Sequence, residues 1–424
     1  MPRAYMPRIA DELLGNRLEA RGAVLVEGPK WCGKTTTARQ RAASAVYMAD
    51  PALRSQNLTL ADVEPAALLR GEVPMLIDEW QLAPQLWDAV RFEVDVRDSF
   101  GQFILTGSSV PPATEKITHT GTGRISRLRM RPMSLVESGD SQGEVSLRQL
   151  FDGEQVPVLK SEMDLAEVAY LLCRGGWPRA INQPQKIALQ QARDYVDAVV
   201  ESDISRVDGV ERDPHTARRL MRSYARMVSS QGRISQIAED LGSRGSGPSI
   251  KTVRAYLTAL ERIFVIEDLA AWNPNLRSKS AIRTSDTRHF VDPSIATAAL
   301  GVDPNGILRD LETFGLLFES LCVRDLRVYT DALEGDLFHF RDKRGLECDA
   351  VIHLHDGRYG LVEVKLGGED QINQGAAGLR AIADNIDRTR MPEPSFTMVL
   401  TAVGGYSLNR PDGVKVVPIG MLGP

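Results

Sequence analysis

The sequence predicts an α/β protein of about three folded units, because 424 residues exceed what one ordinary hydrophobic core accommodates. Three patterns support this fold class. Short apolar segments alternate with helical stretches over residues 9–140, which is typical of a parallel sheet built from βα units. Apolar residues recur at helical spacing over residues 231–264, which predicts two helices. The last part of the chain predicts a helix over residues 314–323 and strands over residues 337–341, 348–354 and 360–365.

The composition is that of a globular protein, with 43% hydrophobic and 25% charged residues. No apolar run approaches the roughly 18 residues that a membrane span needs, and the first 21 residues lack the apolar core of a secretory signal. The four cysteines are scattered and form no CxxC pair, which argues against a disulfide framework or a zinc site. We therefore expect a cytoplasmic protein without a membrane partner.

The first predicted strand, residues 23–27, runs directly into a complete GxxxxGK[ST] motif. The motif comprises Gly28, Pro29, Lys30, Trp31, Cys32, Gly33, Lys34 and Thr35, and Thr36 continues the helix that it opens. Its glycines let successive backbone amides face a phosphate group, and the start of the following helix adds partial positive charge. We expect these residues to bind ATP, with Lys34 at the β- and γ-phosphates and the Thr35 hydroxyl as a ligand of Mg²⁺.

A second predicted strand, residues 75–77, ends in two acidic residues, which is the Walker B pattern. Asp78 is expected to hold Mg²⁺ through its water shell. Glu79 is expected to orient and polarise the attacking water. This pair of acids predicts hydrolysis of ATP in addition to binding.

Two further nucleotide contacts are predicted downstream. The strand over residues 103–105 is followed by hydroxyl side chains, and either Ser108 or Thr106 is expected to sense the γ-phosphate. Arg124 is expected to act as an arginine finger, because a guanidinium neutralises charge on the transferring phosphoryl group. Three other arginines compete for that role, namely Arg127, Arg129 and Arg131.

A resemblance to a known family rests on the runs LVEGPKWCGKTT, MLIDEWQ and FILTGSS, with a later GRI and RGGWP. Together they resemble the prokaryotic AAA-type ATPases that carry a C-terminal domain of unknown function, over nearly the whole chain. The resemblance implies ATP binding and, by analogy, a DNA-related or defence or toxin–antitoxin role. The expected domains are an AAA-type P-loop ATPase domain (1–140), a helical lid or linker (141–210), a winged-helix-like domain (211–292) and a PD-(D/E)XK restriction-endonuclease-like domain (293–424).

Charged residues near the C-terminus follow the E…D…ExK order of metal-dependent nucleases. Glu319 lies on a predicted helix, Asp349 begins a predicted strand, and Glu363 and Lys365 end the next one. Strand alternation places Glu363 and Lys365 on the same face. The three carboxylates are expected to hold a divalent metal, and Lys365 to position or deprotonate water. The same spacing also fits a solvated strand face, and Glu347 is an alternative to Asp349 as ligand.

The middle of the chain is basic although the net charge of the whole chain is -5. Residues 206–288 contain 15 Lys and Arg against 9 Asp and Glu. If residues 249–264 form a recognition helix, its exposed basic side chains would contact DNA phosphates. These are Lys251, Arg254 and Arg262, with Arg244 in the preceding turn and Arg277, Lys279 and Arg283 in a wing. The alternative is a structural connector that binds no DNA.

Two functions from different classes follow from these features. The first is an ATP-hydrolysing enzyme coupled to DNA, with a nuclease activity in its last domain. The second is a nucleotide-switched module that contacts a partner protein or a further copy of itself, and whose last domain is catalytically silent. The intact Glu79 and the E…D…ExK residues favour the first.

Overall fold

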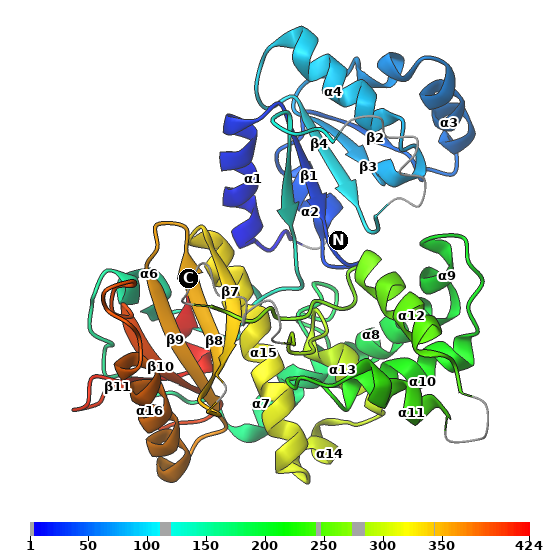
Figure 1. Cartoon of the computed structure of the whole chain (residues 1–424). Coiled ribbons are helices and arrows are strands. Elements are labelled where there is room, and N and C mark those ends of the chain that lie inside the picture. The colour runs from blue at the N-terminus through cyan, green and yellow to red at the C-terminus, as the bar shows by residue number, and fades with distance from the viewer. Residues whose placement is uncertain (1–3, 111–119, 243–246, 274–284, 343) are drawn as a thin grey trace. The chain divides into compact units, whose positions relative to one another are not determined.

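The computed structural model describes residues 4–110, 120–242, 247–273, 285–342 and 344–424. The chain forms two compact units (Figure 1). Unit 1 comprises residues 1–132, 201–213 and 256–265, and unit 2 comprises residues 133–200, 214–255 and 266–424. This division differs from the four expected domains, because most of the chain after residue 132 forms one unit and two short segments from its middle belong to unit 1.

Unit 1 contains a five-stranded parallel sheet with strand order β2-β3-β4-β1-β5. The strands are β1 (Ala23–Glu27), β2 (Ser44–Tyr47), β3 (Met75–Asp78), β4 (Phe103–Gly107) and β5 (Ile125–Arg129). The helices around it are α1 (Ile9–Ala20), α2 (Lys34–Arg39), α3 (Arg54–Val63) and α4 (Leu86–Arg97). The three strands predicted in this region are confirmed.

Side chains of β1 point alternately to the two faces of the sheet, which explains why unit 1 has a layer of helices on each face. Ala23 and Leu25 pack in a core with residues of α3 and α4, whereas Val24 and Val26 pack with residues of α1 and α2. Helices α1 and α4 accordingly lie on opposite sides of the sheet (Figure 1). Because the strands are parallel, their carboxyl ends meet at one edge, where Glu27 is in register with Gly107 and Asp78 with Thr106.

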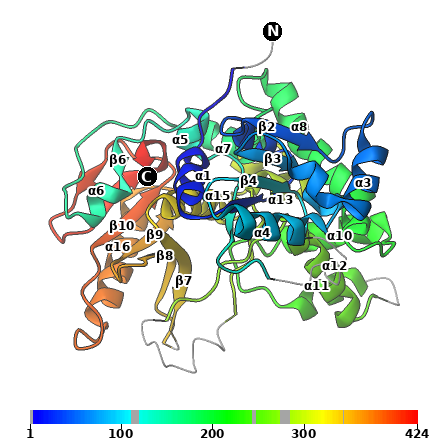
Figure 2. The ribbon, with the colours of Figure 1, turned by 90° about the horizontal axis from the view of Figure 1, so that it is seen from above.

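Unit 2 contains a six-stranded mixed sheet with strand order β11-β12-β10-β9-β8-β7. Its strands are β7 (Gly335–Arg341), β8 (Glu347–Leu354), β9 (Tyr359–Lys365), β10 (Phe396–Thr401), β11 (Leu408–Asn409) and β12 (Lys415–Pro418). Helix α16 (Glu369–Asp384) shares a core with β8, β9 and β10 and lies along them in both views (Figure 1, Figure 2). Helix α15 (Leu311–Ala332) contacts β7, β8 and β9 and is longer than the predicted 314–323.

Residues 137–156, which the sequence suggests are a connection, carry secondary structure of their own. The end of helix α5 (Leu135–Ser138) falls in this stretch, followed by strand β6 (Val145–Ser146) and helix α6 (Leu147–Phe151). Strand β6 pairs in parallel with β13 (Leu422–Gly423) near the C-terminus. Helices α7 (Leu165–Arg174) and α8 (Gln185–Ala198), expected as a lid or linker, pack against α13 (Pro293–Leu300) within unit 2.

The RGGWP run forms the turn that its two glycines predict. Gly175 has a φ of 69°, in the left-handed region that favours glycine. The backbone N–H of Gly176 donates to Asp292 Oδ2 at 2.9 Å, and the indole N–H of Trp177 donates to Ser294 Oγ at 2.9 Å. Trp177 is fully buried, so this run is a structural element of the unit 2 core.

The basic middle contains the helices α10 (Pro214–Ala225), α11 (Ile234–Gly242) and α12 (Ile250–Arg262). The two helices predicted over residues 231–264 are confirmed, and Ser249 Oγ accepts a hydrogen bond from the N–H of Thr252 as an N-cap does. The aliphatic residues 265–271, whose composition suggests the first strand of a wing, form single antiparallel bridges that join Ile266 to Phe290 and Leu269 to Thr287 and not a regular strand. The basic candidates Arg244, Arg277, Lys279 and Arg283 lie outside the described residues.

Two general expectations can be compared with the structure. Within the described ranges, no helix has both the length and the apolar character that crossing a membrane requires. All four cysteines are buried and carry free thiols.

Candidate functional site

The phosphate loop of unit 1 follows a backbone path that its glycines permit. A Cβ atom at Gly28 would lie only 2.0 Å from the carbonyl oxygen of Met130. Gly33 and Trp31 have φ values of 106° and 69°. The Cys32 thiol is buried, 3.5 Å from the same Met130 carbonyl. The motif therefore forms a loop seated against the end of β5, as the sequence predicts for a phosphate-binding turn.

The two lysines of this loop have different partners. The Lys34 ammonium is buried and donates to the carbonyl oxygens of Gly28 at 2.9 Å and Pro29 at 2.7 Å, so it lies within the loop itself. The Lys30 ammonium instead forms an ion pair with Asp203 at 2.6 Å. Thr36, also predicted to bind ATP, is exposed on helix α2.

The Asp78 carboxylate accepts hydrogen bonds from hydroxyl groups on two separate elements. Its Oδ1 atom accepts hydrogen bonds from Thr35 Oγ1 of the phosphate loop at 2.7 Å and from Thr106 Oγ1 of β4 at 2.6 Å. The predicted Mg²⁺ ligand Thr35 and the Walker B residue Asp78 are thus in direct contact. Carboxylate and hydroxyl oxygens form the donor set that Mg²⁺ prefers, so these residues fit the predicted ion.

Glu79 is held in place by neighbouring polar side chains. Its Oε2 accepts from Ser108 Oγ at 3.2 Å and from the side-chain amide of Gln81. Its φ of 56° is uncommon for a residue other than glycine, which indicates backbone strain at this strand end. Of the two proposed sensors, Ser108 therefore contacts Glu79, and Thr106 contacts Asp78.

Arg124 lies at the edge of the sheet opposite the phosphate loop. It precedes Ile125, whose register partner is Ala23 at the start of β1, whereas the loop follows Glu27 at the other end of β1. Five residues of strand span about 16 Å, so Arg124 does not reach a nucleotide bound in its own chain. It forms an ion pair with Asp95 at 2.8 Å. Within its own chain Arg124 thus lies away from the phosphate loop, and its role as an arginine finger stays a prediction.

Two of the competing arginines form ion pairs with Glu27, which lies at the edge of the sheet that carries the phosphate loop. Arg127 lies 3.0 Å and Arg129 lies 3.6 Å from the carboxylate of Glu27. Both belong to β5, which pairs with β1 along its full length. Their positive charges therefore lie near the phosphate loop, but the negative charge of Glu27, which directly precedes Gly28, partly compensates them.

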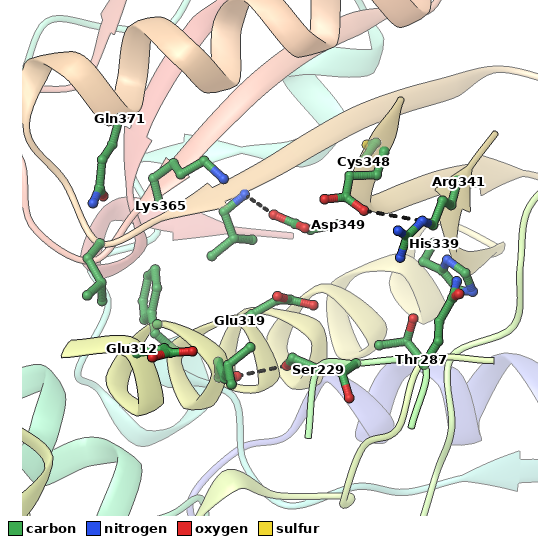
Figure 3. A pocket seen from close by; sticks show the side chains of 18 of the residues that line it. Ser229, Thr287, Glu312, Glu319, His339, Arg341, Cys348, Asp349, Lys365 and Gln371 are labelled. Carbon is green, nitrogen blue, oxygen red and sulfur yellow. Dashed lines mark hydrogen bonds and ion pairs between the residues drawn. The ribbon is translucent and has the colours of Figure 1, made fainter. Parts of the chain in front are cut away.

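Unit 2 contains a polar pocket of about 510 Å³ that several of the C-terminal candidates line (Figure 3). Glu319 extends from helix α15 and faces Asp349 of β8 across the pocket (Figure 3). Lys365 of β9 and the alternative acid Glu347 line it as well. The Asp349 carboxylate accepts a hydrogen bond from the backbone N–H of Val364 at 2.7 Å, which fixes its orientation.

Burial, followed by neighbouring charges, shifts the pKa values of these carboxylates. Burial, followed by the charges of Asp349 and Glu363, raises the pKa of Glu319 well above its usual range. Burial raises the pKa of Asp349, although the Lys365 ammonium opposes this shift. Burial and the neighbouring Asp349 raise the pKa of Glu363 to about 8. Three acids with raised pKa values beside a lysine mark this cluster as a functional candidate.

Glu363 does not line the pocket with the other acids. Its Oε1 accepts from the Lys365 ammonium at 2.7 Å, and helix α16 passes close to it at Gly375. A Cβ atom at Gly375 would come within 3.1 Å of Glu363 Cγ. Among the described residues, no group of three or more His, Cys, Asp or Glu side chains is arranged to hold a metal ion. In these side-chain positions Glu363 is paired with Lys365, and the three-carboxylate metal site stays a prediction.

Sequence reasoning missed two side chains of the nucleotide site. Gln81 contacts Glu79 from two positions away, and it was visible in the run MLIDEWQ as a polar residue beside the acids. Asp203 contacts Lys30 across 173 positions of sequence, and no local pattern signals it. Its identification required the folded chain.

Family models match three separate parts of the chain. Residues 20–138 match an AAA domain, residues 165–306 match a domain of unknown function (DUF8612), and residues 314–422 match another domain of unknown function (DUF4143). The AAA match and the loop geometry agree that unit 1 contains an AAA-type P-loop domain that binds ATP.

Relatives and solved structures show weaker similarity. Uncharacterized proteins of Mycobacterium tuberculosis and Mycobacterium bovis are each 24% identical over 361 residues, which cover 84% of this chain and 73% of theirs. A Walker-type ATPase of Pyrococcus abyssi aligns with a TM-score of 0.42 and 17% identity over 70% of this chain and 96% of its own. The helicase domain of Hef from Pyrococcus furiosus aligns with a TM-score of 0.21 and 12% identity over 94% of this chain and 90% of its own. TM-scores below 0.5 do not establish a shared fold, so the AAA match carries the assignment.

Proposed function

We propose that the chain is a Mg²⁺-dependent ATP hydrolase. The observation that supports this most directly is the convergence of Thr35 and Thr106 on one oxygen of Asp78, beside a Glu79 that Ser108 and Gln81 hold. The Thr35 hydroxyl and the Asp78 carboxylate would hold Mg²⁺, which would supply positive charge to the phosphates. Lys34 contributes positive charge to the phosphates, and the Glu79 carboxylate orients the attacking water and accepts its proton.

Release of inorganic phosphate from ATP by the purified chain tests this function. Turnover is expected with Mg²⁺ and is expected to stop when the ion is removed with EDTA, because the Thr35 and Asp78 oxygens act through the cation. Binding of ATP without any phosphate release would leave an ATP-binding protein and would refute the hydrolase.

We also propose that this ATPase is coupled to DNA through a winged-helix-like middle. Three helices followed by two antiparallel bridges support that architecture. Lys251 and Arg254 are exposed on the first turns of α12, where phosphates could reach them. Other arginines of the basic region have acidic partners, such as Arg212 with Asp208, which reduces the free positive charge.

Replacing Lys251 and Arg254 together by Ala is expected to weaken DNA binding at every sequence tested. Loss of about two phosphate contacts should reduce the slope of log affinity against log salt by up to about 1.8. A salt titration with a labelled duplex measures the slope. The double variant Arg388→Ala and Arg390→Ala is the matched control, since both are exposed arginines of unit 2. If affinity and slope match those of wild type, residues 249–264 belong to a structural connector.

ATP turnover with and without DNA separates the two functional classes. Stimulation by DNA supports an enzyme coupled to nucleic acid. Turnover that is insensitive to DNA favours the alternative, in which the nucleotide state controls contact with a partner protein or a further copy of the chain.

For the pocket of unit 2, we propose a divalent cation site of the restriction-endonuclease type that forms when Glu363 turns away from Lys365. Asp349 and Glu319 already face the pocket. Burial raises the pKa of both, neighbouring carboxylates raise that of Glu319 further, and a cation would stabilise their charged forms. Glu363 would complete the ligands, and the released Lys365 ammonium would face the substrate phosphate. A catalytically silent pocket is the alternative.

Binding of Mn²⁺ at this pocket is expected to strengthen as pH rises toward 8. The Glu363 carboxyl, whose pKa is about 8, is protonated below that pH, and a protonated carboxyl is a poor ligand. Calorimetry with Mn²⁺ at pH 6, 7 and 8 measures the trend. Asp349→Ala should abolish both Mn²⁺ binding and any DNA cleavage while ATP turnover persists, and the exposed Asp336→Ala is the control. If Mn²⁺ does not bind at pH 8, the pocket is not a cation site and is catalytically silent.

A further inference from the structure

Lys30 joins the phosphate loop to a distant part of the chain. Its ammonium lies 2.6 Å from Asp203 Oδ1 within unit 1. The Lys30 side chain is 43% exposed, whereas that of Asp203 is only 9% exposed. A nearly buried carboxylate is therefore directed at a loop whose role is to receive the negative phosphates of ATP. Such a carboxylate opposes ATP binding unless a cation neutralises it.

Asp203 belongs to residues 201–213, which we call the returning segment because the chain on both sides of it lies in unit 2. Asp203 ends a π-helical turn (Val199–Asp203), a form that often marks functional positions. Arg212, which is buried, fastens the segment internally by donating to the carbonyl of Ile204 at 2.7 Å and to the carboxylate of Asp208 at 2.7 Å. The carboxylate of Asp203 is thus presented by an internally bonded segment.

A second short segment, residues 256–265, also belongs to unit 1 and contacts the same region. The N–H of Val110, two residues beyond the sensor candidate Ser108, donates to the carbonyl of Arg262 at 3.0 Å. The guanidinium of Arg212 lies over the ring of Tyr256 at 5.7 Å. The returning segment therefore contacts residues 256–265, and both contact the edge of the sheet at which ATP binds.

We propose that Lys30 exchanges between Asp203 and the phosphates of bound ATP, so that the returning segment is held when ATP is absent and released when ATP binds. This inference rests on the proposed ATP site. Lys30 is one of the residues between Gly28 and Gly33 that surround the phosphates, and a lysine ammonium on a flexible four-carbon stem can change partners. Because coupling between two binding events is reciprocal, loss of Asp203 must alter the affinity for ATP.

A double-mutant cycle on Lys30 and Asp203 tests the exchange. Asp203→Asn is expected to tighten ATP binding by roughly three- to tenfold at low salt, because it frees the ammonium and removes a negative charge. Lys30→Met is expected to weaken binding. In the Lys30→Met background, Asp203→Asn should have a smaller effect, because it then removes only the repulsion between the carboxylate and the phosphates and frees no ammonium. Equilibrium dialysis with ATP at two salt concentrations provides the dissociation constants. If Asp203→Asn changes the ATP dissociation constant by the same factor in both backgrounds, Asp203 acts only by electrostatic repulsion of the phosphates, and the exchange is refuted.

Two controls keep this outcome distinct from general effects. Asp197→Asn makes the same chemical change at an exposed ion pair with Arg218 in unit 2 and should leave ATP affinity unchanged. Glu211→Gln removes an exposed negative charge from the same segment as Asp203 and should also leave ATP affinity unchanged. If the wild-type chain does not bind ATP, the proposed function fails. If it binds and Asp203→Asn does not change the affinity, only the exchange fails.

Hydrogen exchange provides a second readout that does not depend on affinity. Addition of ATP to wild type should increase exchange at residues 204–212, because their link to the phosphate loop is lost. In Lys30→Met that exchange should already be high without ATP and should not respond to it. Lys30 is at the surface, so this variant completes the test even if Asp203→Asn does not fold. An unchanged ATP response in Lys30→Met contradicts the proposal.

Discussion

Glu79→Gln is expected to bind ATP with wild-type affinity and to lose about 10²- to 10⁴-fold in turnover. Gln is nearly the same size and still accepts a hydrogen bond from Ser108, which contacts Glu79 at 3.2 Å. It cannot take a proton from water, and it removes no positive charge from the phosphates. Single-turnover phosphate release and ATP dissociation constants measured on the same preparation separate the chemical step from binding.

Two further variants test whether the loss of turnover is specific to Glu79 and to the chemical step. Lys34→Ala should weaken ATP binding itself, because its ammonium lies inside the phosphate loop. Glu64→Gln makes the same change as Glu79→Gln at an exposed ion pair with Arg70 and should retain full turnover. Equal turnover in Glu79→Gln and wild type would show that another group handles the attacking water.

Arg324→Met is expected to destabilise unit 2 by about 3–5 kcal/mol, because it leaves two buried carboxylates without a counter-charge. The Arg324 guanidinium is 1% exposed and lies 3.0 Å from Asp292 Oδ2 and 2.7 Å from Asp325 Oδ1. Although burial opposes it, the charges of Asp325 and Asp292 raise the pKa of Arg324. Asp292 and Asp325 also accept hydrogen bonds from the backbone N–H groups of Gly176 and Leu135, respectively. Movement of the two unpaired carboxylates therefore disturbs the backbone at these two positions as well.

Hydrogen exchange by mass spectrometry locates this effect. Strands β8 and β9 of unit 2 should lose protection in Arg324→Met, while β1 and β3 of unit 1 keep theirs. The destabilisation should be larger at pH 8 than at pH 5, because an unpaired buried Asp has a raised pKa and its cost falls once it is protonated. Arg309→Met, at an exposed position, should be nearly neutral. Equal protection in the two variants contradicts the assignment.

Features that lie close together in the chain were predictable from the sequence. The phosphate loop, the pair Asp78 and Glu79, and the strands before them depend on local backbone geometry and on alternation of apolar residues. The same holds for the helix that Ser249 caps and for the strands that carry Asp349 and Lys365. Each of these patterns spans fewer than about 15 residues, so neighbouring side chains determine it.

The tertiary structure alone decided where these elements meet. The parallel register places Arg124 at the edge of the sheet opposite the phosphate loop, which its position in the sequence does not reveal. Glu363 packs against helix α16 at Gly375 and pairs with Lys365, whereas Asp349 and Glu319 line the pocket. The partner of Lys30 lies 173 positions away. Such contacts depend on how whole elements pack, and a sequence pattern with a fixed short spacing contains no record of that packing.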